Sequence, residues 1–218
     1  MNLIDRVYKI LRKEILEGKI APGTRLTETQ LAEKFEMSRT PVREALSRLK
    51  NEGLIGTSPG SGLVVRECSI IDAEEIMGIR IALESYALEQ AFDHFTEMDL
   101  MQLDFFIRKA QLCAEEDNVD AVFKANTEFH DYVLEKSGNK RLKSVLSNVM
   151  DAVLRYRIAT LHYPGNMETS IHNHTKIIAA LKKRDKKQAK QLLIEDIESA
   201  KSVLLKVLKQ LVEEDGEI

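Results

Sequence analysis

Apolar residues in the first quarter of the chain recur at every third or fourth position, which is the spacing of one face of an α-helix. This spacing predicts three helices, over residues 3–17, 27–35 and 38–53, separated by turns that contain glycine, proline or polar residues. Thr27 followed by Gln30 predicts a capping box at the start of the second helix, because each side chain can bond the other residue's backbone amide. The second and third helices are therefore expected to be joined by a short turn.

The apolar pattern then changes to two short strands joined by a turn. The strands are predicted near Ile55–Thr57 and Leu63–Arg66, and the segment Pro59–Gly62 between them is rich in turn-forming residues. Two helices, a turn, a third helix and a β-hairpin make the order of a winged helix-turn-helix. We expect this domain over residues 1–67.

Beyond a short junction at residues 68–71 the apolar period is helical throughout. We therefore expect an all-α six-helix bundle over residues 72–213 and a fold that is mostly α. The six helices are predicted near residues 72–92, 97–116, 119–136, 140–162, 168–183 and 186–213.

Composition agrees with a helical globular protein and argues against several other classes. Hydrophobic residues make up 44% and charged residues 31% of the 218 residues, which argues against disorder. The small numbers of glycine (10) and proline (4) argue against an all-β fold. No apolar run is long enough for a membrane span, and the charged first turn argues against a secretory signal. Cys68 and Cys113 lack metal or redox spacing, so we expect reduced thiols in a cytoplasmic protein.

The net charge of −3 conceals an uneven distribution along the chain. Residues 1–66 contain 12 Lys and Arg and 8 Asp and Glu, a net charge of +4, whereas the rest of the chain carries −7. A basic first third on an acidic remainder indicates an anion-binding module joined to a domain with a different task.

The second helix of a helix-turn-helix lies in the major groove of DNA, where its N-terminal residues contact base edges. Val42 and Leu46 are expected to face the core, which leaves Arg39 and Arg43 exposed one turn apart. An arginine fork fits the two acceptors of a guanine edge, although two arginines on a helix can also be ordinary solvated charges. The capping box and the wing favour DNA contact. Further contacts to phosphates and the groove are expected from Arg25, Thr29, Ser38, Thr40, Gly60, Ser61 and Gly62.

These residues resemble a known family. Leu26–Ala32 (LTETQLA) and Ser38–Leu46 (SRTPVREAL) look like the GntR family of bacterial transcription regulators. Phe129-His130 and Ser137-Gly138-Asn139, in a set of six helices after the wing, look like the ligand-binding FCD domain of the FadR subgroup. The resemblance implies a regulator rather than an enzyme, which binds palindromic double-stranded operator DNA as a homodimer and responds to small organic acids. It also implies a place in the bacterial cytoplasm, at the nucleoid when DNA is bound, without a membrane partner.

Three helices of the second domain carry polar residues where the apolar period expects core residues. Asn126 and His130 lie one turn apart on the third helix, His174 lies on the fifth, and Asp196 on the sixth. Burial without partners is costly, so these side chains are expected to bond one another or a ligand. Two imidazoles, a carboxylate and an amide oxygen suit Zn²⁺, Ni²⁺ or Mn²⁺. A metal-free hydrogen-bonded cluster is the alternative.

The resemblance implies a metal role for the same four residues. Metal-binding members of the subgroup use an Asp and a His four residues apart and two later His, which correspond here to Asn126, His130, His174 and Asp196. Asn thus replaces the usual Asp, and Asp replaces the usual last His. The net ligand charge stays at −1, so a site is still expected, with its affinity and metal preference altered.

Two arginines are candidate ligands for an effector. Arg80 lies on an apolar helix face, and a buried arginine needs an anion. That anion is either an internal carboxylate, such as Glu84, or an effector carboxylate held in a bidentate fork. Arg157, which lies beside apolar residues of its own helix, is the second candidate.

The sequence as a whole favours a metabolite-responsive DNA-binding regulator, most simply a repressor. One alternative is a metal-dependent hydrolase tethered to DNA, because a bound metal can activate water. The four candidate ligands leave no separate general base for that reaction. The other alternative is an architectural DNA-binding protein without an effector, which leaves the polar cluster unexplained.

Overall fold

The computed structural model describes residues 3–16, 19–52, 54–58, 60, 62–66, 69–151, 160 and 163–215, excluding the side chains of residues 16, 148, 149, 151 and 211–215. These residues form two compact units, one that contains the described residues up to Arg66 and one that contains residues 69–150, 160 and 163–215. The predicted fold class is confirmed, since a small winged helix-turn-helix unit precedes a helical one. None of the described helices is long and apolar enough to cross a lipid bilayer.

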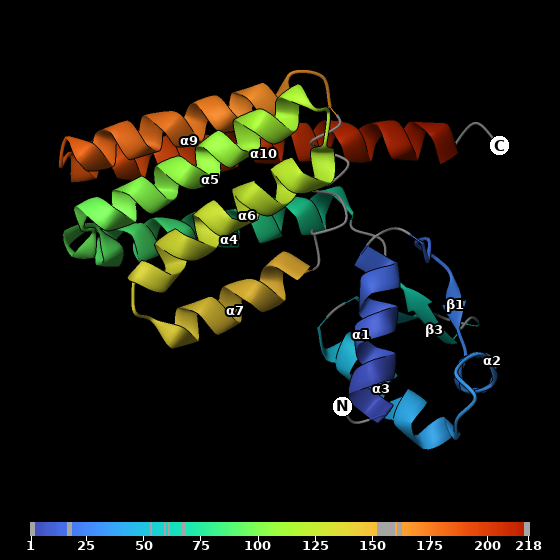
Figure 1. The fold of residues 1–218 in the computed structure, drawn as a ribbon. Helices are drawn as coiled ribbons and strands as arrows, with labels where there is room; N and C mark the ends of the chain where they lie inside the picture. Colours follow the sequence, from blue (N-terminus) through green and yellow to red (C-terminus); the bar gives the residue numbers. More distant parts are fainter. Residues whose placement is uncertain are drawn as a thin grey trace. The chain divides into compact units, whose positions relative to one another are not determined.

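The described part of the first unit contains three helices and a three-stranded antiparallel sheet in the order β1-β3-β2 (Figure 1). Its elements are α1 (Leu3–Leu16), β1 (Arg25–Leu26), α2 (Glu28–Lys34), α3 (Arg39–Asn51), β2 (Ile55–Ser58) and β3 (Gly62–Val65). The predicted end of the third helix at Gly53 lies outside the described residues.

The core of the first unit forms because the helical apolar stripes meet one another and the sheet. α1 packs against α3, and both stripes follow the predicted spacing. The stripe residues Val7, Leu11, Ile15, Val42, Leu46 and Leu49 are exposed by 1% or less.

Strand β1 was not predicted, because two residues are too few to show an alternating pattern. It forms because β3 provides a free edge. The Val65 amide donates to the Thr24 carbonyl at 3.0 Å, and Arg25 pairs with Val64. This pairing places Arg25 beside the wing.

The second unit is a bundle in which α10 packs against α4 and α9, α5 against α6 and α9, and α6 against α4 (Figure 1). α4, α6, α9 and α10 therefore surround a common interior. Its described elements are α4 (Ile70–Ala91), the 3₁₀ turn η1 (Phe92–His94), α5 (Glu97–Glu115), α6 (Val119–Lys136), α7 (Lys140–Asp151), α9 (Asn166–Lys182) and α10 (Lys186–Asp215).

Capping residues set the starts of these helices. Ser69 and Asp72 form a reciprocal capping box, so α4 begins at Ile70, two residues before the predicted start. Thr96 and Asp99 form a second box, and α5 begins at the predicted residue. Of the helix predicted over residues 140–162, the described part is α7. Most of the remainder, residues 152–159 and 161–162, lies outside the described residues.

The apolar core of the first unit predicts a mutational effect. Leu46 is 1% exposed, so we expect Leu46→Ala to lower the free energy of unfolding of this unit by about 2–5 kcal/mol. Hydrogen exchange read by mass spectrometry should show faster exchange within residues 3–66 and little change in the second unit. Leu3→Ala, at a side chain that is 53% exposed, is the matched control. Equal effects of the two substitutions would contradict this description of the core.

Candidate functional site

The N-terminal part of α3 presents the predicted DNA-reading residues to solvent. Val42 and Leu46 are buried, and Arg39 and Arg43 are exposed on the opposite side, as the helical period predicts. Ser38 is the N-cap, but its side chain makes no capping hydrogen bond. The hydroxyl of Ser38 and the first amides of α3, which lack partners within the helix, therefore suit a phosphate.

Arg43 is not an isolated surface charge. Its Nε donates to Glu28 Oε1 at 2.8 Å, and its Nη2 donates to Glu28 Oε2 at 2.8 Å. Glu28 is the first residue of α2, so the ion pair joins the two helices of the helix-turn-helix. The hydrogen bonds from Arg43 hold the pKa of Glu28 below its usual value. The sequence correctly predicted that Arg43 is exposed. It did not predict the ion pair with Glu28, because the two residues are 15 positions apart in the chain.

The other predicted DNA contacts lie around α3 in the first unit. Thr29 and Thr40 are exposed. Arg25 is exposed on β1 beside β3. Gly60 and Gly62 adopt φ angles of +77° and +79°, a left-handed conformation that favours glycine at the tip of the wing. Ser61 lies outside the described residues.

Inside the second unit, Arg80 and Glu84 form a buried ion pair one turn apart on α4. Arg80 is 3% exposed, and its Nε donates to Glu84 Oε1 at 2.6 Å. The other carboxylate oxygen of Glu84 lies 2.7 Å from His130 Nδ1 on α6. Arg80 thus has the internal partner that the sequence offered as one of two possibilities. Sequence reasoning did not predict the contact between Glu84 and His130.

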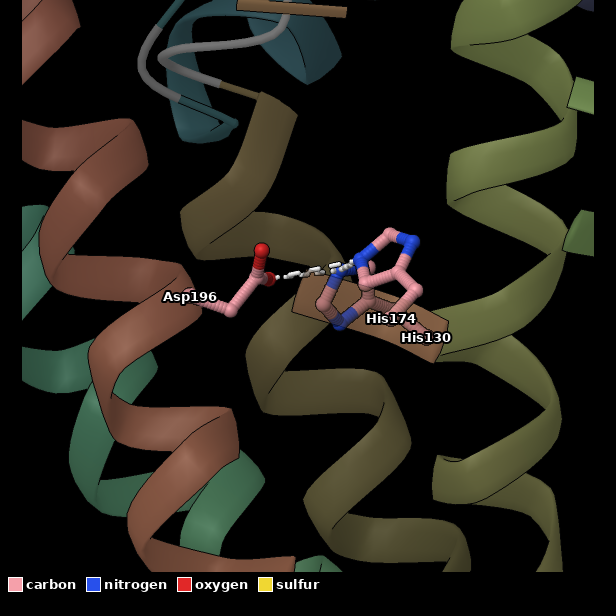
Figure 2. A group of neighbouring side chains, drawn as sticks. All are labelled: His130, His174 and Asp196. Carbon is pink, nitrogen blue, oxygen red and sulfur yellow. Dashed lines mark hydrogen bonds and ion pairs between the residues drawn. The ribbon is translucent and has the colours of Figure 1, made fainter. Parts of the chain in front are cut away.

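Two further side chains complete the cluster. His174 Nε2 of α9 lies 3.1 Å from His130 Nε2 and 3.3 Å from Asp196 Oδ2 of α10. Asp196 Oδ2 is also 3.6 Å from His130 Nε2. Figure 2 shows the carboxylate of Asp196 directed toward the two imidazole rings. The His174 ring is fixed by stacking on Phe129, with 4.2 Å between ring centroids.

The charges in this cluster are set by burial and by close partners. Burial raises the pKa of Glu84, but the charges and hydrogen bonds of Arg80 and His130 lower that pKa further, so Glu84 is ionised at neutral pH. Burial also raises the pKa of Asp196, and its contacts with His174 bring it below the usual value. Burial holds the pKa of His130 below its usual value, so this imidazole is neutral. An ionised carboxylate can only accept a hydrogen bond, so the proton of the neutral His130 ring lies on Nδ1, next to Glu84. The other nitrogen, Nε2, then carries a lone pair.

Asn126 lies next to the cluster with one unused polar atom. Its Nδ2 donates to Ser170 Oγ at 3.0 Å, whereas its Oδ1 is buried without a hydrogen-bond partner among the described residues. His174 Nδ1 is likewise buried without a partner in that part of the chain. Unpartnered buried polar atoms are costly. Asn126 Oδ1 therefore indicates a bound group, which is either a hydrogen-bond donor or a metal ion.

The three donor atoms have a spacing that fits one metal ion. His130, His174 and Asp196 offer ligand atoms that all lie within 4.8 Å of one another. Ligands about 2.0–2.2 Å from a common ion lie about 3.0–3.6 Å from one another. The separations of 3.1, 3.3 and 3.6 Å fall in this range. Two imidazoles and a carboxylate therefore fit a divalent transition metal, with Glu84 on the far nitrogen of His130 as is usual for metal-binding histidines.

Arg80 and a metal would both bind Nε2 of His130. Arg80 Nη2 lies 3.2 Å from His130 Nε2, the same nitrogen that faces His174 and Asp196. Because a single lone pair on Nε2 serves either a guanidinium donor or a metal, the two compete for it.

A cavity of about 50 Å³ opens beside the cluster. A single water needs roughly 10–15 Å³ by the same measure, so there is room for a few water-sized groups. The cavity is bounded by apolar side chains and by several amides and hydroxyls. Its lining includes Met77, Arg80, Phe123, Asn126, His130, Thr160, Asn166, Ser170, Asn173, Asp196 and Ser199. Arg157, the second predicted effector ligand, lies outside the described residues.

Comparison with known proteins gives the same division of the chain. The family of bacterial regulatory proteins called gntR matches residues 3–65, and the FCD domain matches residues 75–199. The chain is 34% identical over 204 residues to the uncharacterized HTH-type transcriptional regulator YdhC of Bacillus subtilis (strain 168), a span that covers 90% of each protein. It is 30% identical over 181 residues to the HTH-type transcriptional repressor RspR of Escherichia coli (strain K12), which covers 83% of this chain and 79% of RspR.

A solved structure supports the same relationship. The structure of E. coli McbR/YncC matches with a TM-score of 0.76 and 28% identity, over 94% of this chain and 98% of that one. The matching families and the relatives are transcriptional regulators, not enzymes. Because the two family matches fall on the winged unit and the helical unit, the chain belongs to the GntR family of DNA-binding transcriptional regulators, in the FadR-like subgroup whose second domain is FCD.

Proposed function

We propose that this regulator is a cytoplasmic repressor that binds a palindromic operator as a homodimer and is modulated by a small carboxylate in its helical unit. The observation that carries the proposal is the buried cluster of Arg80, His130, His174 and Asp196, of which Arg80, His130 and Asp196 line a cavity. The relative RspR is named a transcriptional repressor, which supports the sign of regulation.

In this proposal a divalent metal occupies the cluster. His130, His174 and Asp196 would hold it, with Asn126 Oδ1 as an additional oxygen ligand. Zn²⁺, Ni²⁺ and Mn²⁺ all accept such mixed nitrogen and oxygen donors. When bound, the metal supplies a Lewis-acidic anchor for a carboxylate oxygen. The substitution of Asn for the acid expected at residue 126 weakens the site, because an amide oxygen carries no charge.

Charge favours an acid as the effector. A metal binds imidazoles in their uncharged form, so the charges of the metal-binding cluster are one guanidinium and two carboxylates, a net charge of −1 that a divalent ion changes to +1. A buried site with one uncompensated positive charge favours an anion. A metal that uses the lone pair of His130 also leaves an N–H of Arg80 for that anion. The volume of the cavity favours an acid of few atoms.

The effector regulates DNA binding through the geometry of the dimer. Two copies of α3 read two half-sites at a fixed spacing along the duplex. A ligand that binds one arrangement of the helical unit more tightly shifts the population toward that arrangement. Operator affinity then changes by the difference in ligand affinity between the two arrangements.

A second candidate function is an architectural DNA-binding protein without an effector. The observation that favours it is the Arg80 network, which pairs much of the cluster internally without any ligand. Against it stand the unpartnered Asn126 Oδ1 and the adjoining cavity.

The recognition helix predicts the effect of removing Arg43. An operator is first obtained by selecting bound duplexes from a random pool. We expect Arg43→Ala to weaken binding to this operator by about 5- to 150-fold for each half-site, since a bidentate guanine contact supplies about 1–3 kcal/mol. The loss of preference should centre on one base pair in each half-site, and titration should give two chains per duplex. Arg108→Ala on α5 is the control, at an exposed arginine of the second unit. Unchanged operator binding by Arg43→Ala would refute the assignment of α3.

Thermal melting tests the metal and the acid together. Chelator-treated protein is melted with carboxylic acids and sugar acids, each with and without Zn²⁺, Ni²⁺ or Mn²⁺. We expect the metal to raise the melting temperature and acids to raise it further only when metal is present, because ligands of the folded state stabilise it by mass action. His174→Ala should abolish both effects, whereas His172→Ala, at an exposed position of α9, should retain them. Stabilisation by an acid without metal would make Arg80 the anchor. No stabilisation by any ligand would favour the architectural alternative.

The contact between Glu84 and His130 predicts an effect on metal affinity. Glu84→Gln removes the charge that orients His130, so we expect metal affinity to fall about 10- to 100-fold. Competition with a coloured chelator measures this affinity directly, at a temperature where the variant is folded. Glu89→Gln is the control, because Glu89 lies on the same helix and pairs with Lys190 at the surface. Equal affinities of Glu84→Gln and the parent protein would contradict a role for the Glu84 charge in supporting a metal-bound His130.

A further inference from the structure

The ion pair between Glu28 and Arg43 occupies only one edge of the guanidinium. The carboxylate accepts from Nε and from Nη2, each at 2.8 Å. Arginine has five N–H donors, and this contact uses one on Nε and one on Nη2. Three N–H donors remain, shared by Nη1 and Nη2 at the end of the side chain. That end is the edge that forms paired hydrogen bonds with O6 and N7 of guanine.

The solvent exposure of the two side chains agrees with one guanidinium edge bound by Glu28 and the other edge open to solvent. The Arg43 side chain is 67% exposed, whereas the Glu28 side chain is 30% exposed. Glu28 therefore contacts the guanidinium from the protein side and leaves much of the arginine to solvent. An arginine held in this way loses less rotamer freedom when it binds DNA than one that moves freely.

Glu28 is itself fixed by its place in the fold. It is the first residue of α2, after the N-cap Thr27, whose side chain accepts a hydrogen bond from the Gln30 amide at 3.3 Å. A carboxylate in the first turn is favoured by the helix dipole. Leu31 and Ala32 of the same helix are buried in the core of the first unit. The position of Glu28 relative to α3 is therefore determined by packing and not by the ion pair alone.

We propose that Glu28 is a positioning residue for operator recognition, which holds one edge of Arg43 so that the other edge meets a guanine. This proposal rests on the proposed reading of DNA by α3. It assigns to Glu28 two opposite effects on binding. The carboxylate improves discrimination at the base pair that Arg43 reads, and its negative charge weakens attraction to phosphates of any sequence.

These opposite effects provide the test. The operator and the base pair that Arg43 reads are first defined by selection with the parent protein and with Arg43→Ala. Binding of Glu28→Gln, Glu28→Asp and Glu44→Gln is then measured by fluorescence anisotropy on three duplexes. These are the operator, the operator with that base pair changed, and a random sequence. Glu44 is exposed on α3 next to Arg43, so Glu44→Gln changes the charge by the same amount and leaves the ion pair intact.

For Glu28→Gln we expect tighter binding to the random duplex and a loss of discrimination at the single base pair on the order of tenfold, within the range for a bidentate guanine contact. Glu28→Asp keeps the charge but shortens the side chain, so discrimination should fall without a gain on random DNA. Glu44→Gln should raise binding to all three duplexes and keep discrimination. In an Arg43→Ala background, Glu28→Gln should no longer affect discrimination, as a thermodynamic cycle requires for direct coupling.

Two outcomes would overturn the proposal. If Glu28→Gln binds the operator more tightly and discriminates as well as the parent protein, Glu28 only masks Arg43. If its effect on discrimination persists without Arg43, Glu28 acts through another residue. Failure of the proposed function gives a different result, since the parent protein would then select no sequence or Arg43→Ala would bind the selected operator unchanged.

Discussion

The arrangement of helices around the polar cluster depends on the burial of the Arg80 guanidinium. A side chain that is 3% exposed and always charged needs an anion, and Glu84 provides it one turn away on the same helix. The second oxygen of Glu84 then fixes His130 on α6, which approaches His174 on α9 and Asp196 on α10. Four helices thus meet at one polar point. Their packing cannot change there without breaking the contacts that the buried charged groups make with the two imidazoles.

An arginine–glutamate pair at the surface, between Arg43 and Glu28, has a different role from the buried pair of Arg80 and Glu84. Glu28 and Arg43 form two hydrogen bonds, but both side chains are partly exposed to solvent. Exposed ion pairs contribute little to stability. Their value lies in the orientation of a long flexible side chain. Burial therefore gives the Arg80 pair a role in holding the fold together, whereas exposure suits the Arg43 pair to recognition.

The polar cluster also suits communication between a ligand and the rest of the chain. α4 carries Arg80 and is the first helix after the wing, with residues 66–69 between β3 and α4. A ligand that takes the lone pair of His130 alters a contact made by α4. In the proposed function, a small change at the cluster would therefore act on the helix that is nearest in the chain to the winged unit.

The sequence by itself determined the winged helix-turn-helix, the helical unit and the polar positions within it. Apolar spacing is a local property, so it identified the buried faces of α3, α6, α9 and α10 and the exposure of Arg39 and Arg43. Three features depended on contacts between distant residues. β1 needed the edge of β3, Glu28 needed the turn that brings α2 to α3, and Glu84 needed the approach of α6 to α4. Periodicity shows which side of a helix is buried, but only tertiary packing decides which side chain on another helix satisfies its charge.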